Sequence, residues 1–193
     1  METCDIPIER HPLKPFLPPN ARVLMLGSFP PPVKRWSMHF FYPNIQNDMW
    51  RIFGLLFFHD KNHFYDIAGK RFRLDILRPF LEEKGIALFD TATAVRRLKS
   101  NASDAFLEIV EETDIKELLK DIPRCKTIIA TGQKAASVLS NQFHSGELSI
   151  GEPIHTGGFT LYRMPSSSRS YPLALEKKAA FYSSVLTSLA DTL

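Results

Sequence analysis

The chain has 193 residues, of which 44% are hydrophobic and 23% are charged. This length and composition fit one globular domain over residues 1–193, and they exclude a disordered, collagen-like or coiled-coil protein. The net charge of +3, from 24 Lys and Arg against 21 Asp and Glu, is too small to indicate or exclude a nucleic-acid partner by itself.

The N-terminal part is expected to open with an extended segment. Residues 1–20 contain five prolines and predict a lead-in without regular structure, so the folded domain covers 21–193. Residues 22–27 are an apolar run that ends in glycine, which predicts a buried strand. A long loop over 28–46 follows, and a loop of that length inside a compact domain is usually functional.

Helices and strands are then expected to alternate. Residues 49–58 predict a largely buried helix, with Asn47 or Asp48 as its N-cap. The later elements are a helix over 74–84 closed by Gly85, a strand over 86–89, a helix over 114–121 capped by Thr113, a strand over 127–130, a helix over 133–141, a strand over 159–163, a polar loop over 164–172 and a helix over 173–189.

This alternation predicts an α/β fold with a mainly parallel sheet and helices on both faces. Ligands of such folds bind outside the carboxyl ends of the strands. The segments that follow the predicted strands are distinctive, and they lie at 27–30, 90–93, 131–133 and 164–168. We therefore expect these four segments to converge on one cleft.

The cysteines and the apolar runs suggest where the protein works. Cys4 and Cys125 lie far apart, so both thiols are expected to be free, as in the reducing cytoplasm, and a four-cysteine iron–sulfur cluster within one chain is excluded. The longest strongly apolar run, 53–58, is much shorter than the roughly 20 residues of a membrane span. We expect a cytoplasmic, monomeric protein without a membrane partner.

Common catalytic signatures are absent. The sequence has no glycine-rich phosphate loop, no HExxH and no GxSxG, and its six histidines show no spacing typical of a metal site, so no metal is expected. One hydrolase hypothesis stays open, in which Ser28 is a nucleophile and His155, three residues after Glu152, is its base.

Aromatic residues cluster before a proline in the long loop. Phe40, Phe41 and Tyr42 precede Pro43, and Trp50 follows in the predicted helix. Trp50 and at least one phenylalanine are expected in the core. Tyr42 is the better candidate for a platform on which a base stacks, a contact worth about 1–3 kcal/mol.

Three segments together resemble the uracil-DNA glycosylase superfamily, and its mismatch-specific uracil/thymine and hypoxanthine-DNA glycosylase branches in particular. Residues 26–30 (Leu-Gly-Ser-Phe-Pro) resemble its first motif, a strand that ends in Gly-x-x-Pro. Residues 41–50 resemble the aromatic segment that leads to Asn-x-x-Trp, and residues 164–169 (Met-Pro-Ser-Ser-Ser-Arg) are similar to its second motif. The order and spacing agree, and the resemblance spans roughly residues 20–190.

The resemblance implies a three-layer α/β/α fold with a four-stranded, mainly parallel sheet. It also implies a DNA-repair enzyme without a cofactor, which flips a deaminated base, uracil or hypoxanthine, out of double-stranded DNA and hydrolyses its N-glycosidic bond. Flipping costs about a few kcal/mol. The pocket residues implied are Gly27, Ser28, Phe29 and Tyr42, and the DNA-binding residues implied are Pro165, Ser166, Ser167, Ser168 and Arg169, which suit phosphate contacts.

Catalysis is assigned to two further positions. In much of the superfamily a polar third residue of the first motif holds the attacking water, but here that residue is Phe29. The hypoxanthine-type branch uses the asparagine of Asn-x-x-Trp, which is Asn47, and Asn47 could also cap the helix. Asp90, at the end of the second predicted strand, could read the base edge, assist the water or cap the following turn.

A second class of function stays open because of Phe29. A protein with the same fold that has lost catalysis would bind damaged DNA and release no base.

Overall fold

Within the described residues, 6–99 and 103–190, five strands form the central sheet of the computed structural model. The parallel strands are, in spatial order, β5 (Ile86–Asp90), β2 (Val23–Gly27), β8 (Thr127–Thr131) and β10 (Phe159–Met164), and β9 (Ile154–Thr156) pairs antiparallel with β10 at the edge. The mainly parallel sheet with four parallel strands is confirmed, whereas the edge strand β9 is absent from the prediction.

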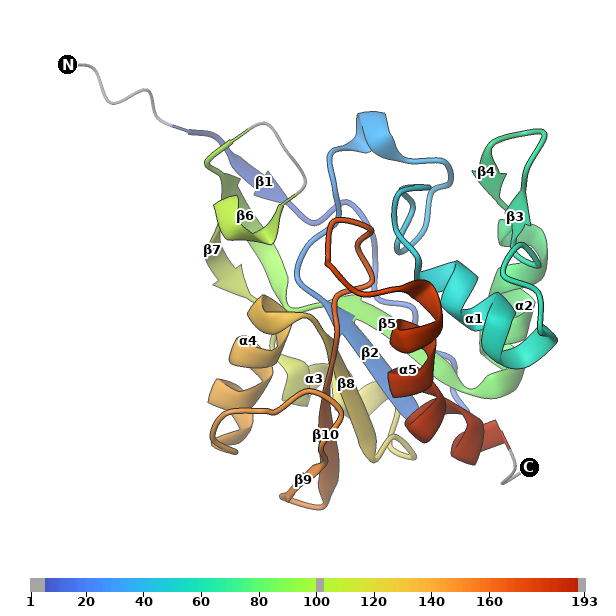
Figure 1. Ribbon diagram of the computed structural model, residues 1–193. Coiled ribbons are helices and arrows are strands. Elements are labelled where there is room, and N and C mark those ends of the chain that lie inside the picture. Colours follow the sequence, from blue (N-terminus) through green and yellow to red (C-terminus); the bar gives the residue numbers. More distant parts are fainter. Residues whose placement is uncertain (1–5, 100–102, 191–193) are drawn as a thin grey trace.

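Helices cover both faces of this sheet (Figure 1). One face carries α1 (Met49–Phe58), α2 (Leu74–Lys84) and α5 (Leu175–Ala190), and the other carries α3 (Ile115–Asp121) and α4 (Gln133–Phe143). Every residue of β2 and β5 is buried, as expected for strands in a sheet that is covered on both faces. The predicted three-layer α/β/α architecture is confirmed.

The helix boundaries follow the sequence signals closely. α2 ends where Gly85 adopts a left-handed conformation with φ of 65°, which glycine takes up without strain. The predicted cap of α3 is wrong. Asp114, not Thr113, is the N-cap, and its side chain accepts a hydrogen bond from the N–H of Glu117. Thr113 instead donates its hydroxyl to the backbone oxygen of Asp90 at 2.7 Å.

The lead-in is more ordered than predicted. β1 (Ile8–Arg10) joins β6 (Ala92–Arg97) and β7 (Leu107–Glu112) in a second, antiparallel sheet. Phe16 pairs with Leu88 through two backbone hydrogen bonds of 3.0 and 2.9 Å and so covers the free edge of β5. The prediction of no regular structure is therefore wrong for residues 8–10. The first five residues of that lead-in lie outside the described residues.

Short elements complete the upper part of Figure 1. The loop after β2 contains the 3-10 turn η1 (Val33–Arg35), and a second such turn, η2 (Asp104–Phe106), precedes β7. β3 (Tyr65–Asp66) and β4 (Arg71–Phe72) form a small hairpin between α1 and α2.

Several apolar residues that were predicted to be buried lie in the core. Trp50, Phe40 and Phe41 are buried, as is Cys125, whose thiol pKa is raised to about 12 chiefly by burial. Such a thiol stays protonated and unreactive near neutral pH. Cys4 lies outside the described residues. In the part of the chain that the structure describes, no helix has the length and apolar character of a membrane span.

Candidate functional site

A cleft of about 1100 Å³ lies at the carboxyl ends of β2, β5, β8 and β10. The predicted convergence of the four strand-end segments is confirmed. All of the predicted site residues line this cleft, namely Gly27, Ser28, Phe29, Tyr42, Asn47, Asp90, Pro165, Ser166, Ser167, Ser168 and Arg169. The structure thus brings together residues from distant parts of the chain, while their roles stay predictions.

Asp90 ends β5 directly opposite Gly27 of β2. The carboxylate is buried, and its Oδ2 lies 2.7 Å from Nε2 of His11. A Cβ atom at Gly27 would lie 2.4 Å from Asp90 Oδ1 and 3.4 Å from the hydroxyl of Tyr42. Only glycine at position 27 leaves the carboxylate room to approach the strand, so the glycine of the first motif and Asp90 form one packed unit.

His11 comes from the lead-in and was not identified from the sequence. Its side chain is only 3% exposed and is surrounded by the rings of Phe29, Phe41 and Phe89. Its Nδ1 lies 3.0 Å from the oxygen and 3.1 Å from the nitrogen of Leu13. With both ring nitrogens engaged, the imidazole holds Asp90 in one orientation.

Tyr42 is held at the cleft by both its backbone and its hydroxyl. Its φ of 49° is in the left-handed region, and its hydroxyl lies 3.0 Å from Oγ1 of Thr131 at the end of β8. The ring packs edge-on against buried Trp50 at 5.7 Å. Burial, and then the nearby charge of Asp90, raise the pKa of Tyr42 well above its usual value, so the phenol stays neutral. The arrangement gives a fixed ring on the cleft wall.

Of the two predicted N-cap candidates of α1, Asp48 occupies the N-cap position, and Asn47 directly before it lines the cleft. The Oδ1 of Asn47 accepts a hydrogen bond of 2.9 Å from the N–H of Met49, the first residue of α1, and so satisfies one of the free N–H groups of the helix start. The side-chain NH₂ group makes no hydrogen bond to another described residue, so it is available to a ligand. The hydrogen bond to the helix start and a catalytic role are therefore compatible in the same side chain.

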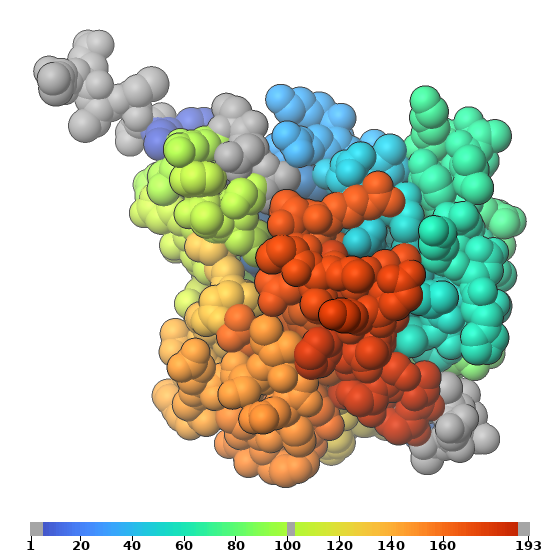
Figure 2. All heavy atoms as spheres, in the orientation of Figure 1, coloured from blue at the N-terminus to red at the C-terminus, as the bar shows by residue number. Residues whose placement is uncertain are grey.

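The serine loop is tied to the Asn47 segment by backbone hydrogen bonds. The N–H of Asp48 donates to the oxygen of Ser167 at 2.8 Å, and the N–H of Arg169 donates to the oxygen of Gln46 at 3.1 Å. Figure 2 shows the loop after β10, in orange, lying directly against the segment around residue 45, in cyan. Two of the three motif segments thus form one structural unit.

A buried ion pair anchors this unit to α5. Nζ of Lys178, whose side chain is 1% exposed, lies 3.2 Å from Oδ2 of Asp48 and 2.7 Å from the backbone oxygen of Ser168. Nε of Arg169 lies 3.1 Å from the other oxygen of Asp48, while the Arg169 side chain stays 44% exposed. Arg169 is therefore held at the cleft with much of its guanidinium open to a phosphate. Lys178 was not identified from the sequence.

A second carboxylate in the cleft was not identified from the sequence either. Asp104, in η2, accepts a hydrogen bond of 2.6 Å from the hydroxyl of Ser28. Burial is the largest influence on Asp104 and raises its pKa, which the Ser28 hydrogen bond and the charge of Lys134 partly offset. Lys134 in turn donates to the backbone oxygen of Leu107 at 2.7 Å. The cleft thus contains two carboxylates, the buried Asp90 and the partly buried Asp104.

The free energy of unfolding of Asp104→Asn, relative to that of the wild type, is expected to increase as the pH rises from 4 to 8. Because the pKa of Asp104 is raised in the folded state, the unfolded chain loses this proton first, and the wild type loses stability until the pH passes the folded-state pKa. Asparagine stays neutral and avoids that loss. Calorimetric melting of both proteins across this range checks the prediction, and a difference independent of pH would contradict it.

The Ser28–His155 hydrolase hypothesis is wrong. His155 lies on β9, pairs with Thr160 near the start of β10, and is hydrogen-bonded to the hydroxyl of that threonine. Thr160 aligns with Thr127 and Val23 at the starts of β8 and β2, whereas Ser28 follows the end of β2. At about 3.3 Å per residue, the two side chains lie at opposite ends of the sheet.

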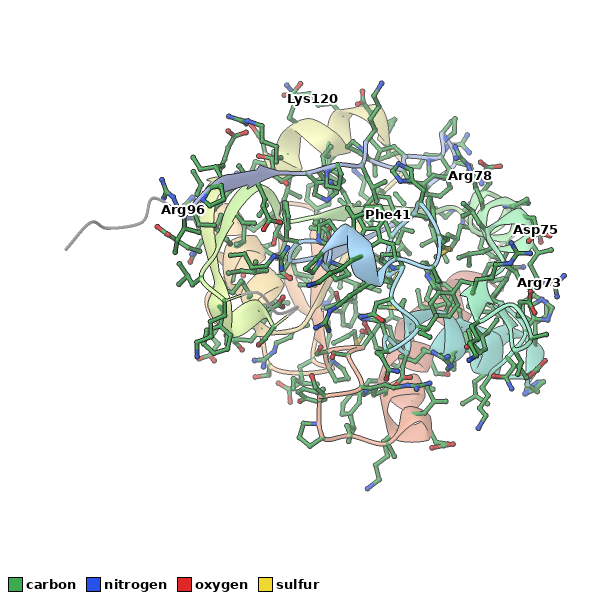
Figure 3. All side chains as sticks on the ribbon, turned by 90° about the horizontal axis from the view of Figure 1, so that it is seen from above. Phe41, Arg73, Asp75, Arg78, Arg96 and Lys120 are labelled. Atoms are coloured by element: carbon green, nitrogen blue, oxygen red, sulfur yellow. The ribbon has the colours of Figure 1, made fainter. Side chains whose placement is uncertain are left out.

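The charged residues of the cleft favour an anionic ligand. Its basic lining residues are Arg35, Lys134, Arg163 and Arg169, against the carboxylates of Asp90 and Asp104. The acidic residues of the segment 108–121 do not line the cleft. Figure 3, a view onto the carboxyl ends of the strands, shows Phe41 near the centre and Arg73, Arg78, Arg96 and Lys120 at the periphery.

Comparisons with known proteins identify the fold. No protein-family model and no curated protein matches the chain. The chain is similar in structure to a protein from Methanosarcina acetivorans, solved by solution NMR and described as a "putative Uracil DNA glycosylase", with a TM-score of 0.67 and 21% sequence identity. The match covers 95% of this chain and 99% of that one. The chain therefore has a uracil-DNA glycosylase-like fold over nearly its whole length.

Proposed function

We propose that this protein is a DNA glycosylase of the uracil-DNA glycosylase superfamily, which hydrolyses the N-glycosidic bond of a flipped deaminated base, uracil or hypoxanthine. One observation carries the proposal. The three motif segments that resemble the superfamily, far apart in the sequence, meet with a buried carboxylate at one cleft of this fold. Fold likeness alone would leave the activity open, because one fold supports many functions.

The proposed base pocket lies between the first motif and Tyr42. The ring of Tyr42 stacks on the flipped base, and Gly27, Ser28 and Phe29 line the pocket. Cleavage leaves negative charge on the departing base, and donors directed at that charge lower the barrier. The backbone N–H groups of Ser28 and Phe29 donate to no other described residue. They are therefore candidates to receive the anionic base.

The attacking water is assigned to the opposite side of the sugar carbon. The free NH₂ group of Asn47 orients this water, and the carboxylate of Asp90 assists it or stabilises the positive charge on the sugar. A carboxylate in a buried site is well suited to both tasks, because little solvent screens it. The chemistry requires no metal or organic cofactor.

The DNA partner is assigned to the serine loop. Ser166, Ser167 and Ser168 offer hydroxyl and backbone donors for phosphate oxygens, Pro165 stiffens the loop, and Arg169 supplies positive charge. These contacts contribute to offsetting the cost of flipping the base.

The test is a single-turnover assay on oligonucleotides that contain uracil, hypoxanthine or a G·T mismatch, with abasic product as the readout. Asn47→Ala is expected to lower the rate by about 10²-fold, because a small displacement of the attacking water from its reactive position lowers the rate by about that factor. Asn44→Ala is the matched control, since its Oδ1 makes a similar local bond, 3.0 Å to the N–H of Gln46. Full activity of Asn47→Ala would contradict only the role assigned to Asn47. Absence of abasic product on every substrate would contradict the proposal that the protein is an enzyme.

A binding protein without catalysis is the second candidate, and Phe29 supports it. The ring packs edge-on against His11 at 5.3 Å and against the small cluster of Ala92, Val95 and Leu107, so it brings no polar group to the water. A protein of this kind would bind a uracil-containing duplex more tightly than an undamaged one and yet release no base.

A further inference from the structure

The hydroxyl of Ser28 points its single hydrogen at a carboxylate. Ser28 follows β2 beside Gly27, and its Oγ–H donates to Oδ1 of Asp104 at 2.6 Å. Ser28 is buried, Asp104 is partly buried, and both line the cleft. The proposed excision mechanism uses the backbone N–H of Ser28 and its place in the pocket wall, but it uses neither the Ser28 hydroxyl nor Asp104.

This bond fixes what Ser28 can offer to a ligand. A serine hydroxyl has one hydrogen and two lone pairs, and an ionised carboxylate can only accept. While Asp104 is ionised, the hydrogen of Ser28 is committed to it, and only lone pairs remain for the cleft. Lys134 from α4 and Arg97 from β6 act on Asp104 with positive charge, and Asp90 from β5 acts with negative charge. Burial has the largest influence and raises the pKa of Asp104, whereas the Ser28 hydrogen bond and the two cations act in the opposite direction and favour the ionised carboxylate.

Deamination changes the ring nitrogen beside the amino carbon from a hydrogen-bond acceptor to a donor, and an acceptor in the cleft can distinguish the two. In cytosine and adenine the ring nitrogen beside the amino carbon carries a lone pair. In uracil and hypoxanthine the same nitrogen carries hydrogen, next to a carbonyl group. An acceptor that cannot turn into a donor therefore binds the deaminated base and repels the parent base. An unpaired acceptor in a buried site costs about 1–3 kcal/mol.

We propose that Asp104 is a specificity-determining residue, which holds the Ser28 hydroxyl as an acceptor so that the cleft selects bases with a ring N–H beside a carbonyl. This inference rests on the proposed function for its substrate class. It adds the chemical reason why the undamaged amino bases are rejected. Asp104 acts through Ser28 and need not touch the base.

The test compares binding of two single-stranded oligonucleotides by fluorescence anisotropy. They are identical except for one 2′-fluoro-2′-deoxyuridine or 2′-fluoro-2′-deoxycytidine, which resist cleavage, and single strands remove differences in base pairing. The wild type is expected to prefer the uracil form. In Asp104→Asn the amide NH₂ donates to Ser28, whose hydrogen then turns to the cleft, so the ratio of the two Kd values is expected to fall at least tenfold.

Two further variants separate this effect from charge and from loss of the hydroxyl. Asp75→Asn changes the net charge equally at the first turn of α2, on the periphery (Figure 3), and is expected to keep the wild-type ratio. Ser28→Ala is expected to weaken binding of the uracil form without improving binding of the cytosine form. Melting curves confirm that each variant is folded.

The outcomes distinguish this inference from the proposed function. An unchanged Kd ratio in Asp104→Asn, or no preference in the wild type, overturns the inference even if the protein excises uracil. A preference that collapses in Asp104→Asn supports it even if the excision assay yields no abasic product, a result that would remove only the catalytic proposal.

Discussion

Asp90→Asn is expected to lower the single-turnover rate of base excision by about 10²- to 10⁴-fold. The carboxylate lies buried at the end of β5, and His11 holds it through a 2.7 Å contact. Its negative charge can stabilise the cationic sugar of the transition state and can accept a proton from the attacking water. Asparagine has the same size but neither property. Release of base from a uracil- or hypoxanthine-containing duplex, whichever the wild type cleaves, measures the effect.

Binding of the intact duplex separates the roles that stay open for Asp90. If Asp90 assists the water, the variant is expected to bind at least as tightly as the wild type, because a negative charge facing DNA has been removed. If Asp90 reads the base edge, binding is expected to weaken together with the rate. Asp75→Asn is the matched control, with the same change of charge far from the cleft. A wild-type rate in Asp90→Asn would remove Asp90 from the mechanism.

The parallel sheet could be predicted because its signals are local. Each central strand is a short apolar run next to a turn signal, and each helix has its own periodicity and cap. The small β1–β6–β7 sheet offers no such signal. β1 has three residues, of which only the middle one is partly buried, and it lies among prolines, while β6 ends in two arginines. These strands are set by pairing between distant segments, with Ile8 opposite Arg96, and no local pattern encodes that pairing.

The cleft could be predicted for a related reason. Residues that follow parallel strands must meet at one sheet edge, so the strand order along the chain is enough to place Gly27, Asp90 and the serine loop together. His11, Asp104 and Lys178 could not be placed in this way, because their contacts join positions 79, 76 and 130 residues apart. A lone histidine in a proline-rich lead-in, an aspartate in a turn and a lysine in a helix each have a common structural explanation.

The missed residues share one property, which is that they hold predicted residues in place. His11 orients Asp90, Asp104 fixes the hydroxyl of Ser28, and Lys178 binds both Asp48 and the serine loop. A site of this kind depends on supporting contacts as much as on the groups that meet the ligand. The contact with the largest expected effect on stability is the one made by Lys178, because its charge is almost fully buried.

Lys178→Met is expected to lower the free energy of unfolding by about 3 kcal/mol, near the lower end of the range for removal of one partner from a buried ion pair. Methionine fills the space but leaves the buried carboxylate of Asp48 without its nearest buried cation and the oxygen of Ser168 without its donor. Arg169 remains on Asp48 from the exposed side and limits the loss. Urea unfolding measures the change as a lower midpoint with an unchanged slope.

Two further variants show whether the loss of stability in Lys178→Met comes from the buried Asp48 carboxylate that is left without its lysine. Lys177→Met removes the neighbouring exposed lysine of α5 and is expected to change stability by less than about 0.5 kcal/mol. Asp48→Asn combined with Lys178→Met removes both charges, and it is expected to recover at least half of the loss, because the penalty of an uncompensated buried carboxylate disappears. If the double variant is as unstable as Lys178→Met, packing and not charge is the function of Lys178.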